Sequence, residues 1–360
     1  MSPPRLVAGT LRRCAAVVAA LAVALTATHA AAQRAGAGGA RTVVRAPSTS
    51  FVGMAQAVEQ QDYTVVQLRR FVDEQGQVVS VREQVKVDAN GTSSPAFLLS
   101  FLGVEGQLPG SAAHLQWEQT YERYGALFHR HGSFAIRDLT SVQQNYSLHE
   151  FGAVVRAGRS AVRTVVFPTT NDKSIWVVDV DAATSVPLYW AEFDFQFRLL
   201  AEVEAVSFLD SVIMPAVVLS AAPSAVIHAD FAAADAWLGQ PAGLIQPPPA
   251  FAGYEVATIE TRDDPLNGQQ KLVMTYTDGV DEFLVTQLPG SADPFAALLP
   301  ASGKGGASSM GHTIGRFHDV AMRVLLFWDD GVAFQVAGRG SLERLDEVAR
   351  HLYRQALSTH

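Results

Sequence analysis

The sequence predicts an α+β protein, mostly antiparallel β, with two domains. After a short helical segment near residue 50, the hydrophobic period changes from 3.6 residues to 2 and stays so as far as about residue 210. Residues 211–250 are rich in Ala and Pro and interrupt this pattern. Strand patterns then resume, and the chain closes with a helical one. We therefore expect two antiparallel sheet domains, the second smaller and carrying a C-terminal helix.

The first 32 residues have the pattern of a secretory signal peptide. Arg5, Arg12 and Arg13 precede an apolar run, 14–27, which small residues follow up to Ala32. The run is shorter than the roughly twenty residues that a transmembrane helix needs, and no later stretch is long and apolar enough to span. Cleavage after Ala32 predicts an exported protein without a membrane span, in the periplasm if the cell has one.

Composition excludes several kinds of partner. The only cysteine, Cys14, lies in the signal, so the mature chain is expected to form no disulfide and no thiolate metal site. The chain has 27 basic and 35 acidic residues, and loss of the signal's three arginines leaves 24 against 35, a net charge of −11. Such an acidic chain is poorly suited to phosphate backbones, and we expect no nucleic-acid partner. The 328 residues that remain exceed what one core usually holds, which favours two domains.

The first domain is expected to be one helix followed by a β-meander. Residues 33–47, largely Ala, Gly and Arg, predict a flexible leader ahead of this domain, 48–210. A short amphipathic helix begins behind the N-cap candidates Ser48 to Ser50, and its apolar face carries Phe51, Met54, Ala55 and Val58. Apolar and polar residues then alternate on both sides of a turn at 74–76, which predicts a β-hairpin. The further strand segments are 125–139, 152–168, 174–181 and 186–208.

The last of these segments is rich in aromatic residues. Alternation places Tyr189, Ala191, Phe193, Phe195, Phe197 and Leu199 on one dry face. A half-closed sheet with such an interior can fill it with its own helix or leave it open to an acyl chain. Core packing is the expected fate of each single Phe, whereas the cluster as a whole indicates a hydrophobic groove. The candidate groove and lipid-binding residues are Phe97, Phe101, Trp176, Trp190, Phe193, Phe195 and Phe197.

The second domain follows a linker. Residues 211–250 form this linker, with a short helix predicted at 229–238. In the domain itself, 251–360, strands are expected at 254–262, 270–288 and 323–338, with Asp-Gly turns at Asp278-Gly279 and Asp330-Gly331. The closing helix starts behind Ser341 and has an apolar face of Leu342, Leu345, Val348, Ala349 and Leu352.

No short catalytic motif is present. The sequence lacks G-x-S-x-G, H-E-x-x-H and a strand-following G-x-G-x-x-G, and the run around Lys304 is best interpreted as a flexible loop. Asp179 and Asp181 flank a predicted turn, where aspartate commonly caps its own backbone; this is favoured over a carboxylate pair with Asp172 or Asp194. We expect a protein that is not an enzyme and has no cofactor.

His129 and His131 leave a metal site as an alternative. On a strand both side chains point to one side, and with His114 or His149 they could complete a zinc site. No third ligand follows at a diagnostic spacing, so a solvated strand edge is favoured and no metal is predicted.

Several short motifs occur in a familiar order. In the first domain they are "DYTVVQLRRF", the run 156–159 (RAGR), Pro168 and the hairpin "VVDVDAATSVPLYWAEF". In the second they are "PPPAFAGYEV", "TYTDGVDEFLV" and "AFQVAGRGSLERLDEVARHL". Over residues 50–355 this order resembles the MucB/RseB family, periplasmic regulators of the envelope-stress sigma factor (sigma-E). The N-terminal domain of that family is similar to the lipoprotein carriers LolA and LolB.

The resemblance implies an unclosed half β-barrel wrapped on a helix and linked to a smaller sheet domain. It also implies that the chain binds the periplasmic segment of a membrane anti-sigma factor, and binds lipid, lipopolysaccharide or a lipoprotein acyl chain in the half-barrel. The alternative is a LolA-like carrier of lipid or lipoprotein, whose groove is the working site. Ser185 departs from the family, whose hairpin has glycine there, and a left-handed Ser185 would cost roughly 1 kcal/mol.

Overall fold

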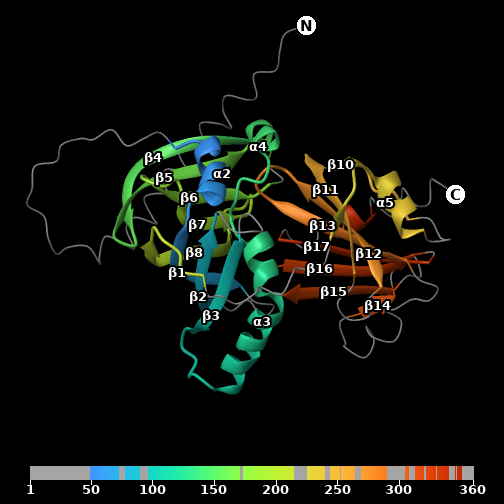
Figure 1. Cartoon of the computed structure of the whole chain (residues 1–360), viewed down its shortest axis with the longest axis horizontal. Helices are drawn as coiled ribbons and strands as arrows, with labels where there is room; N and C mark the ends of the chain where they lie inside the picture. The colour runs from blue at the N-terminus through green and yellow to red at the C-terminus, as the bar shows by residue number, and fades with distance from the viewer. Residues whose placement is uncertain are drawn as a thin grey trace, which may run out of the picture. The chain divides into compact units, whose positions relative to one another are not determined.

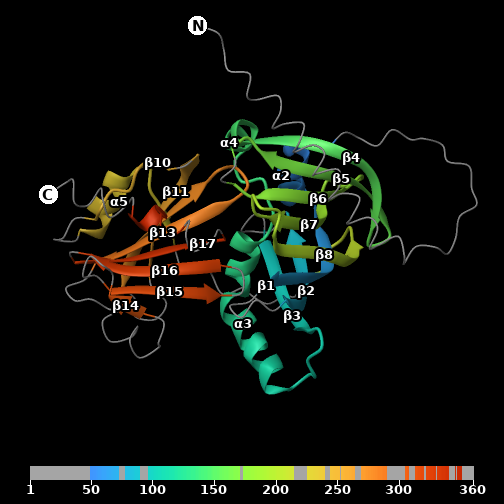
Figure 2. The same cartoon turned by 180° about the vertical axis from the view of Figure 1, so that it is seen from behind.

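The computed structural model contains two antiparallel sheets, one of strands β1–β8 and one of strands β9–β17 (Figures 1 and 2). It describes residues 49–72, 78–89, 96–170, 173–214, 225–239, 244–251, 253–263, 269–289, 305–307, 313–319, 322–329, 331–339, 345 and 347–350. The predicted signal peptide and leader therefore lie outside the described residues, as do Asp172, Lys304 and the predicted turn at 74–76.

The elements have the following bounds. The helices are α2 Phe51–Gln60, α3 Ala112–Gly132, α4 Leu139–Asn145 and α5 Phe231–Leu238. The strands of the first sheet are β1 Tyr63–Val72, β2 Val78–Asp88, β3 Ala96–Val104, β4 Tyr146–Arg156, β5 Arg159–Pro168, β6 Ile175–Asp181, β7 Pro187–Phe193 and β8 Leu199–Leu209. Those of the second are β9 Val226–Ile227, β10 Ala250–Phe251, β11 Tyr254–Asp263, β12 Gln270–Thr277, β13 Glu282–Pro289, β14 Gly305–Ala307, β15 Thr313–Asp319, β16 Met322–Asp329 and β17 Val332–Gly338.

The first sheet is an unclosed barrel, as the family resemblance implies. Its strand order is β3-β2-β1-β8-β7-β6-β5-β4, so β3 and β4 are two edges that do not pair with each other. The meander is joined to its own beginning by β8, which pairs with β1. Figure 1 shows β4 and β5 curving past α2. We call the face of this sheet that packs against α2 its inner face.

Helix α2 confirms the predicted opening helix, and of its predicted apolar face Phe51 and Met54 are buried whereas Ala55 is half-buried. Its N-cap is Ser50, whose side chain accepts a hydrogen bond of 3.0 Å from the backbone N–H of Gly53. Phe51, Met54 and Ala57 follow at helical spacing and are buried against the sheet. The helix therefore fills part of the inner face with apolar side chains.

The strand predicted at 125–139 is wrong. Helix α3 runs from Ala112 to Gly132, behind the N-cap Ser111, whose side chain accepts from the N–H of His114 at 3.2 Å. Trp117 and Tyr121, four residues apart, pack together against Phe71 and Val81 of the sheet. Burial of this apolar helical face favours a helix here, although the short alternation at 125–139 is typical of a strand. A capped helical stripe was the signal that the strand interpretation overlooked.

The segment predicted as one strand, 186–208, is two strands separated by a turn. Strand β7 ends at Phe193 and β8 begins at Leu199. Between them the Asp194 carboxylate accepts from the N–H groups of Gln196 and Arg198, at 2.8 and 2.9 Å. Phe197 takes a left-handed backbone with φ of 62°. The alternation of aromatic residues thus continued through a turn, and the prediction of one continuous aromatic face is wrong.

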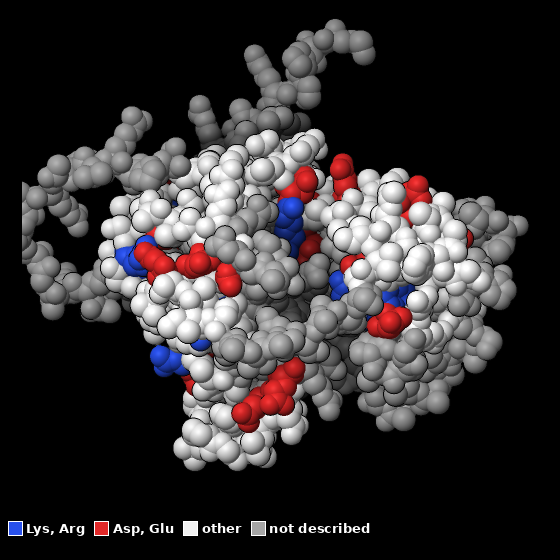
Figure 3. Space-filling view, in the orientation of Figure 1, with Lys and Arg blue, Asp and Glu red and all other residues white. Residues whose placement is uncertain are grey.

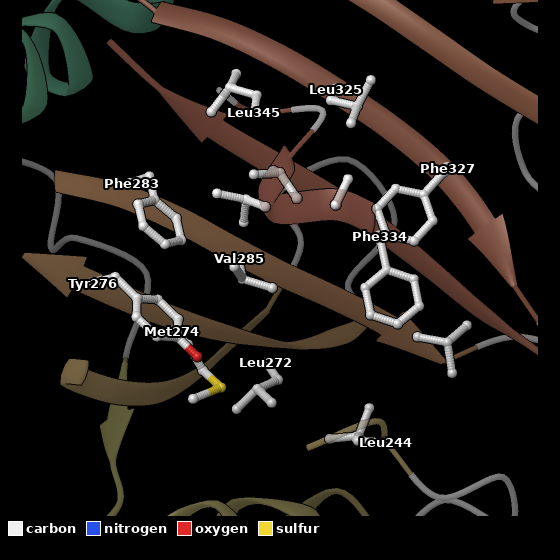
Figure 4. Close-up of a cluster of buried hydrophobic side chains, with 14 of the residues drawn as sticks. Leu244, Leu272, Met274, Tyr276, Phe283, Val285, Leu325, Phe327, Phe334 and Leu345 are labelled. Atoms are coloured by element: carbon white, nitrogen blue, oxygen red, sulfur yellow. The ribbon is translucent and has the colours of Figure 1, made fainter. Parts of the chain in front are cut away.

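The second sheet has a core of its own. The strand order is β10-β11-β12-β13-β17-β16-β15-β14, and β9 pairs with β11. This sheet has nine strands, so it is not smaller in strand number than the first, which has eight. Figure 4 shows Leu272, Met274, Tyr276, Phe283 and Val285 directed into one cluster with Leu325, Phe327, Phe334 and Leu345. Leu345 and residues 347–350 are helical, which agrees with the predicted closing helix.

Ser185 provides a test of local strain. It adopts φ of 61°, as expected for the position where the sequence departs from glycine. Glycine accepts this backbone without a steric cost, so Ser185→Gly should stabilise the protein by about 0.5–1 kcal/mol. Urea unfolding of the mature protein, followed by circular dichroism, measures the change.

Ala183→Gly is the matched control. Ala183 lies in the same turn and has no left-handed backbone, so glycine there should not stabilise the protein. A Ser185→Gly protein no more stable than the wild type would show that the left-handed conformation is not strained.

Candidate functional site

Two tryptophans form the centre of the inner face. Trp176 in β6 and Trp190 in β7 are 0% and 4% exposed, and their ring centroids lie 5.7 Å apart. Phe134 packs against Trp176 at 5.3 Å between ring centroids. Phe51 and Met54 of α2 belong to the same cluster. Side chains of the chain itself therefore occupy the aromatic surface that the sequence indicated as a groove.

The other candidate groove residues are not gathered there. Phe193 is buried but points to the opposite face of β7 from Trp190, because its position differs by an odd number of residues. Phe195 is 57% exposed in the turn after β7, and Phe197 lies in the same turn. Phe101 in β3 contacts Tyr121 of α3, with 5.3 Å between ring centroids. Phe97 lies in β3, and its side chain is outside the described part of the structure.

The turn between β12 and β13 reaches the same inner face. This turn, residues 278–281, we call the tip. Val280 of the tip is 1% exposed and belongs to the apolar cluster of Trp176 and Trp190. Gly279 has φ of 105°, and a Cβ placed on it would lie 2.2 Å from the backbone nitrogen of Val142 in α4. Glycine is required there by both backbone conformation and close approach.

A buried carboxylate at the start of the tip joins the two sheets. Asp278 is 0% exposed and accepts hydrogen bonds at Oδ2 from the hydroxyl of Tyr146, at 2.7 Å, and from Lys173 Nζ, at 3.1 Å. The Lys173 ammonium also lies 4.6 Å from the ring centroid of Tyr254 in the second sheet. Burial, and next the Asp278 charge, raise the pKa of Tyr146 well above its ordinary value, so its hydroxyl keeps its proton and donates.

Asp278 also shapes the tip itself. Its Oδ1 accepts from the N–H groups of Val280 and Asp281, at 3.1 and 2.8 Å. The predicted Asp-Gly turn is therefore confirmed, but the sequence did not reveal that its carboxylate is also a buried ion-pair partner. The partners Tyr146 and Lys173 are more than 100 residues away in the chain, 132 and 105 respectively, and no local pattern connects them.

Arginine residues make two further links between the sheets. Arg339, after β17, pairs with Glu192 of β7, and its guanidinium lies 4.6 Å from the ring centroid of Trp176 and 5.1 Å from that of Trp190. Arg137, between α3 and α4, pairs with Glu282 of β13 at 3.3 Å. The backbone N–H of Arg137 donates to the carbonyl of Gly279 at 2.8 Å. The tryptophans that sequence reasoning assigned to a ligand thus contact the second sheet.

A second polar cluster lies where α3 meets the inner face. Arg69 donates to Glu83 Oε1 at 3.0 Å and to the carbonyl of Gly132 at 2.8 Å. Tyr121 donates to Glu83 Oε2 at 2.9 Å, and Gln67 donates to Oε1 at 2.6 Å. Burial by itself would raise the pKa of Glu83, but the Arg69 charge and these hydrogen bonds outweigh it and lower the pKa. The carboxylate is therefore ionised and fully paired, which suits a structural link from α3 to the sheet.

The carboxylates considered at the sequence level separate into two kinds. Asp181 caps the following turn, accepting from the N–H groups of Ala183 and Thr184 at 3.0 and 2.9 Å, as predicted. Asp179 does not cap a turn. It is buried in β6 and pairs with Arg156 at 2.6 Å and Arg163 at 2.7 Å, on the face opposite to Trp176.

The histidine alternative loses its geometric basis. His129 and His131 lie on α3 and not on a strand, so the strand geometry that the zinc alternative required is absent. Within the described ranges no cluster of three or more His, Cys, Asp and Glu side chains could hold a metal ion. Among those same residues no helix has the length and apolarity to cross a membrane. On the face drawn in Figure 3, the coloured Lys and Arg side chains are interspersed with acidic and uncharged ones and form no continuous basic stripe.

No protein-family model and no curated protein matches the chain. Among solved structures, the chain is similar to MucB in complex with MucA(peri), with 15% identity and a TM-score of 0.44 over 83% of this chain and 95% of that chain. A MucA/MucB complex from Pseudomonas aeruginosa gives 16% identity and a TM-score of 0.42 over 83% and 95%. An outer membrane lipoprotein-sorting protein domain from Vibrio parahaemolyticus gives 12% identity and a TM-score of 0.19 over 46% and 93%.

The close approach of Gly279 to α4 can be tested directly. Gly279→Ala should destabilise the protein by more than about 2 kcal/mol, because the new Cβ clashes with Val142 backbone and the left-handed region disfavours alanine. Gly106→Ala is the control, since it also has positive φ, 76°, but meets nothing within 4 Å. Equal losses in the two variants, measured by urea unfolding, would mean that backbone strain alone acts and that the tip does not press on α4.

His129 predicts a pH dependence of stability. Burial, and next the Arg69 charge, lower its pKa to about 4, against about 6.5 in an unfolded chain. Between these values the unfolded state binds a proton that the folded state does not, so stability falls as the pH falls from about 6.5 towards 4. Lowering the pH from 7 to 5 should cost the wild type about 2 kcal/mol more than the His129→Gln variant. Urea titrations at both pH values measure this difference, and parallel losses would contradict it.

Proposed function

We propose that the chain is a non-enzymatic periplasmic regulator of the envelope-stress response. In this proposal it binds the periplasmic segment of a membrane anti-sigma factor and senses a lipid or other amphiphile on the inner face of the first sheet. The motif order over residues 50–355 and the signal-peptide pattern support the class and the location. The carrying observation is that the tip of the second sheet occupies the apolar cluster of the first.

That arrangement favours a regulator because it couples the two sheets. Val280 contributes to the core of the inner face, and Asp278 is compensated by Lys173 and Tyr146 of the first part of the chain. An amphiphile that packs on Trp176 therefore changes the surface formed jointly by both sheets. Binding energy at one place then alters affinity for a protein partner at another, without a covalent step.

A LolA-like carrier of lipid or lipoprotein is the second candidate. The observation that favours it is the aromatic inner face, where Trp176 and Trp190 offer a large apolar surface. A carrier needs no second sheet joined to that face by buried ion pairs, and this separates the two hypotheses. In the carrier hypothesis Trp176 and Trp190 serve only to bind the ligand. In the regulator hypothesis their contact with the Arg339 guanidinium also links ligand binding to the second sheet.

Native mass spectrometry of the mature protein from its own periplasm tests the proposal. We expect a stoichiometric complex with the periplasmic segment of a membrane protein, and dissociation of that complex when dodecyl phosphate is added. Ile227→Ser is a control variant, because Ile227 is 73% exposed on the short strand β9, and it should behave as the wild type. A bound acyl lipid with no protein partner would instead support the carrier.

A further inference from the structure

The tip has the chemical pattern of an anionic amphiphile. Its sequence places apolar Val280 between the acids Asp278 and Asp281, with Glu282 next. Val280 is buried among Trp176 and its neighbours, while the carboxylates of Asp278 and Glu282 meet cations that belong to the first part of the chain. These cations, Lys173 and Arg137, are 2% and 16% exposed at their side chains.

From this pattern we infer that the tip is a built-in competitor for an anionic amphiphile. The ligand's acyl chain takes the place of Val280 on the inner face, and its headgroup takes the carboxylates' place beside Lys173 and Arg137. The ligand and the docked tip exclude each other. The inference rests on the proposed function and deepens it by naming the charge class of the ligand and the segment that it displaces.

Exclusion follows from the packing. Val280 is 1% exposed, and the backbone of Gly279 approaches Val142 so closely that even one added methyl group would overlap it. An acyl chain cannot share such a contact. Apparent affinity for the ligand is therefore reduced by the fraction of molecules whose tip is docked, and weakening the tip should raise that affinity.

The ligand is inferred to be anionic because withdrawal of the tip separates two cations from their carboxylate partners. When it withdraws, Lys173 loses Asp278 and Arg137 loses Glu282. Cations in a partly desolvated site gain most from a ligand that brings its own negative charge. Headgroup chemistry should therefore matter more at this site than chain length alone.

The test uses the mature full-length protein and three probes with the same twelve-carbon chain, kept below their critical micelle concentrations. Dodecyl phosphate and dodecanoate are anionic, and dodecyl maltoside is uncharged. Isothermal titration calorimetry gives the affinities. Val280→Ala should raise affinity for all three probes by about three- to tenfold, because the docked tip loses apolar contact.

Glu282→Gln gives an independent variant with a milder effect on packing. It removes the carboxylate that competes for Arg137, so affinity for the anionic probes should rise about tenfold, with a smaller change for dodecyl maltoside. Arg137→Gln should weaken this preference, and Lys173 should account for what remains. A stronger gain with dodecyl phosphate points to a phosphate-bearing lipid, and a stronger gain with dodecanoate points to a free fatty acid.

Hydrogen exchange reports on the tip itself. The N–H of Arg137 donates to the carbonyl of Gly279 at 2.8 Å, so binding of dodecyl phosphate should accelerate exchange at Arg137 in the wild type. Ile227→Ser should change neither affinity nor exchange. If the wild type binds a probe but Val280→Ala and Glu282→Gln bind it with unchanged affinity, and Arg137 exchange stays constant, competition by the tip is wrong while amphiphile sensing stands.

Two other outcomes test the charge class of the ligand and amphiphile binding itself. Equal affinities for dodecyl phosphate and dodecyl maltoside in all variants would overturn the anionic charge class. If no probe binds either the wild type or the folded variants, the amphiphile part of the proposed function fails as well, and the competitor inference fails with it.

Discussion

The buried carboxylate of Asp278 is the constraint on which the joined arrangement of the two sheets depends. A fully buried charge is costly unless it is paired and hydrogen-bonded, and Asp278 is paired with Lys173 and accepts hydrogen bonds from Tyr146 and from the tip's own backbone. Removing one partner of such a pair commonly costs 3–5 kcal/mol. Among the links between the two sheets, this one is stable only when complete, unlike a large apolar interface, which would tolerate gradual loss.

Such a contact gives specificity more than strength. Replacing a buried ion pair with apolar residues is often neutral or stabilising, so the charges at Lys173 and Arg339 are poorly explained by stability alone. These charges give the tip a defined position relative to Trp176. They also provide cations whose carboxylate partners water or an anion can replace. A surface pair such as Arg198 with Asp194, where Arg198 is 71% exposed, has neither property.

Much of the fold could be predicted from the sequence, because the signals were local. Period-2 alternation located the hairpin strands β1 and β2, and Ser50 ahead of Phe51 located α2. The wrong predictions also had local causes, because in each a short alternating pattern extended into a segment that is a turn or a helix. Alternating phenylalanines continued from Phe193 into the turn that Asp194 caps, and the short alternation around His129 hid the helical stripe of Trp117 and Tyr121.

The junction could not have been found in this way, since its partners are distant in the chain. Trp176 and Trp190 were noticed for their apolar character, but nothing in the sequence linked them to Arg339. Only the path of the sheets brings these groups together.

The pairing of β1 with β8 has a consequence for how the chain folds. Thr64 is opposite Leu209, so β1 has only its neighbour β2 until β8, the last strand of the meander, is available. The long loop between β1 and β8 must close, at a cost in entropy, before the two strands can pair, and this makes folding slow. Until they pair, one edge of β1 has no neighbouring strand. Until then this chain is expected to need protection from association with other unfolded chains, and the need ends when β8 pairs with β1.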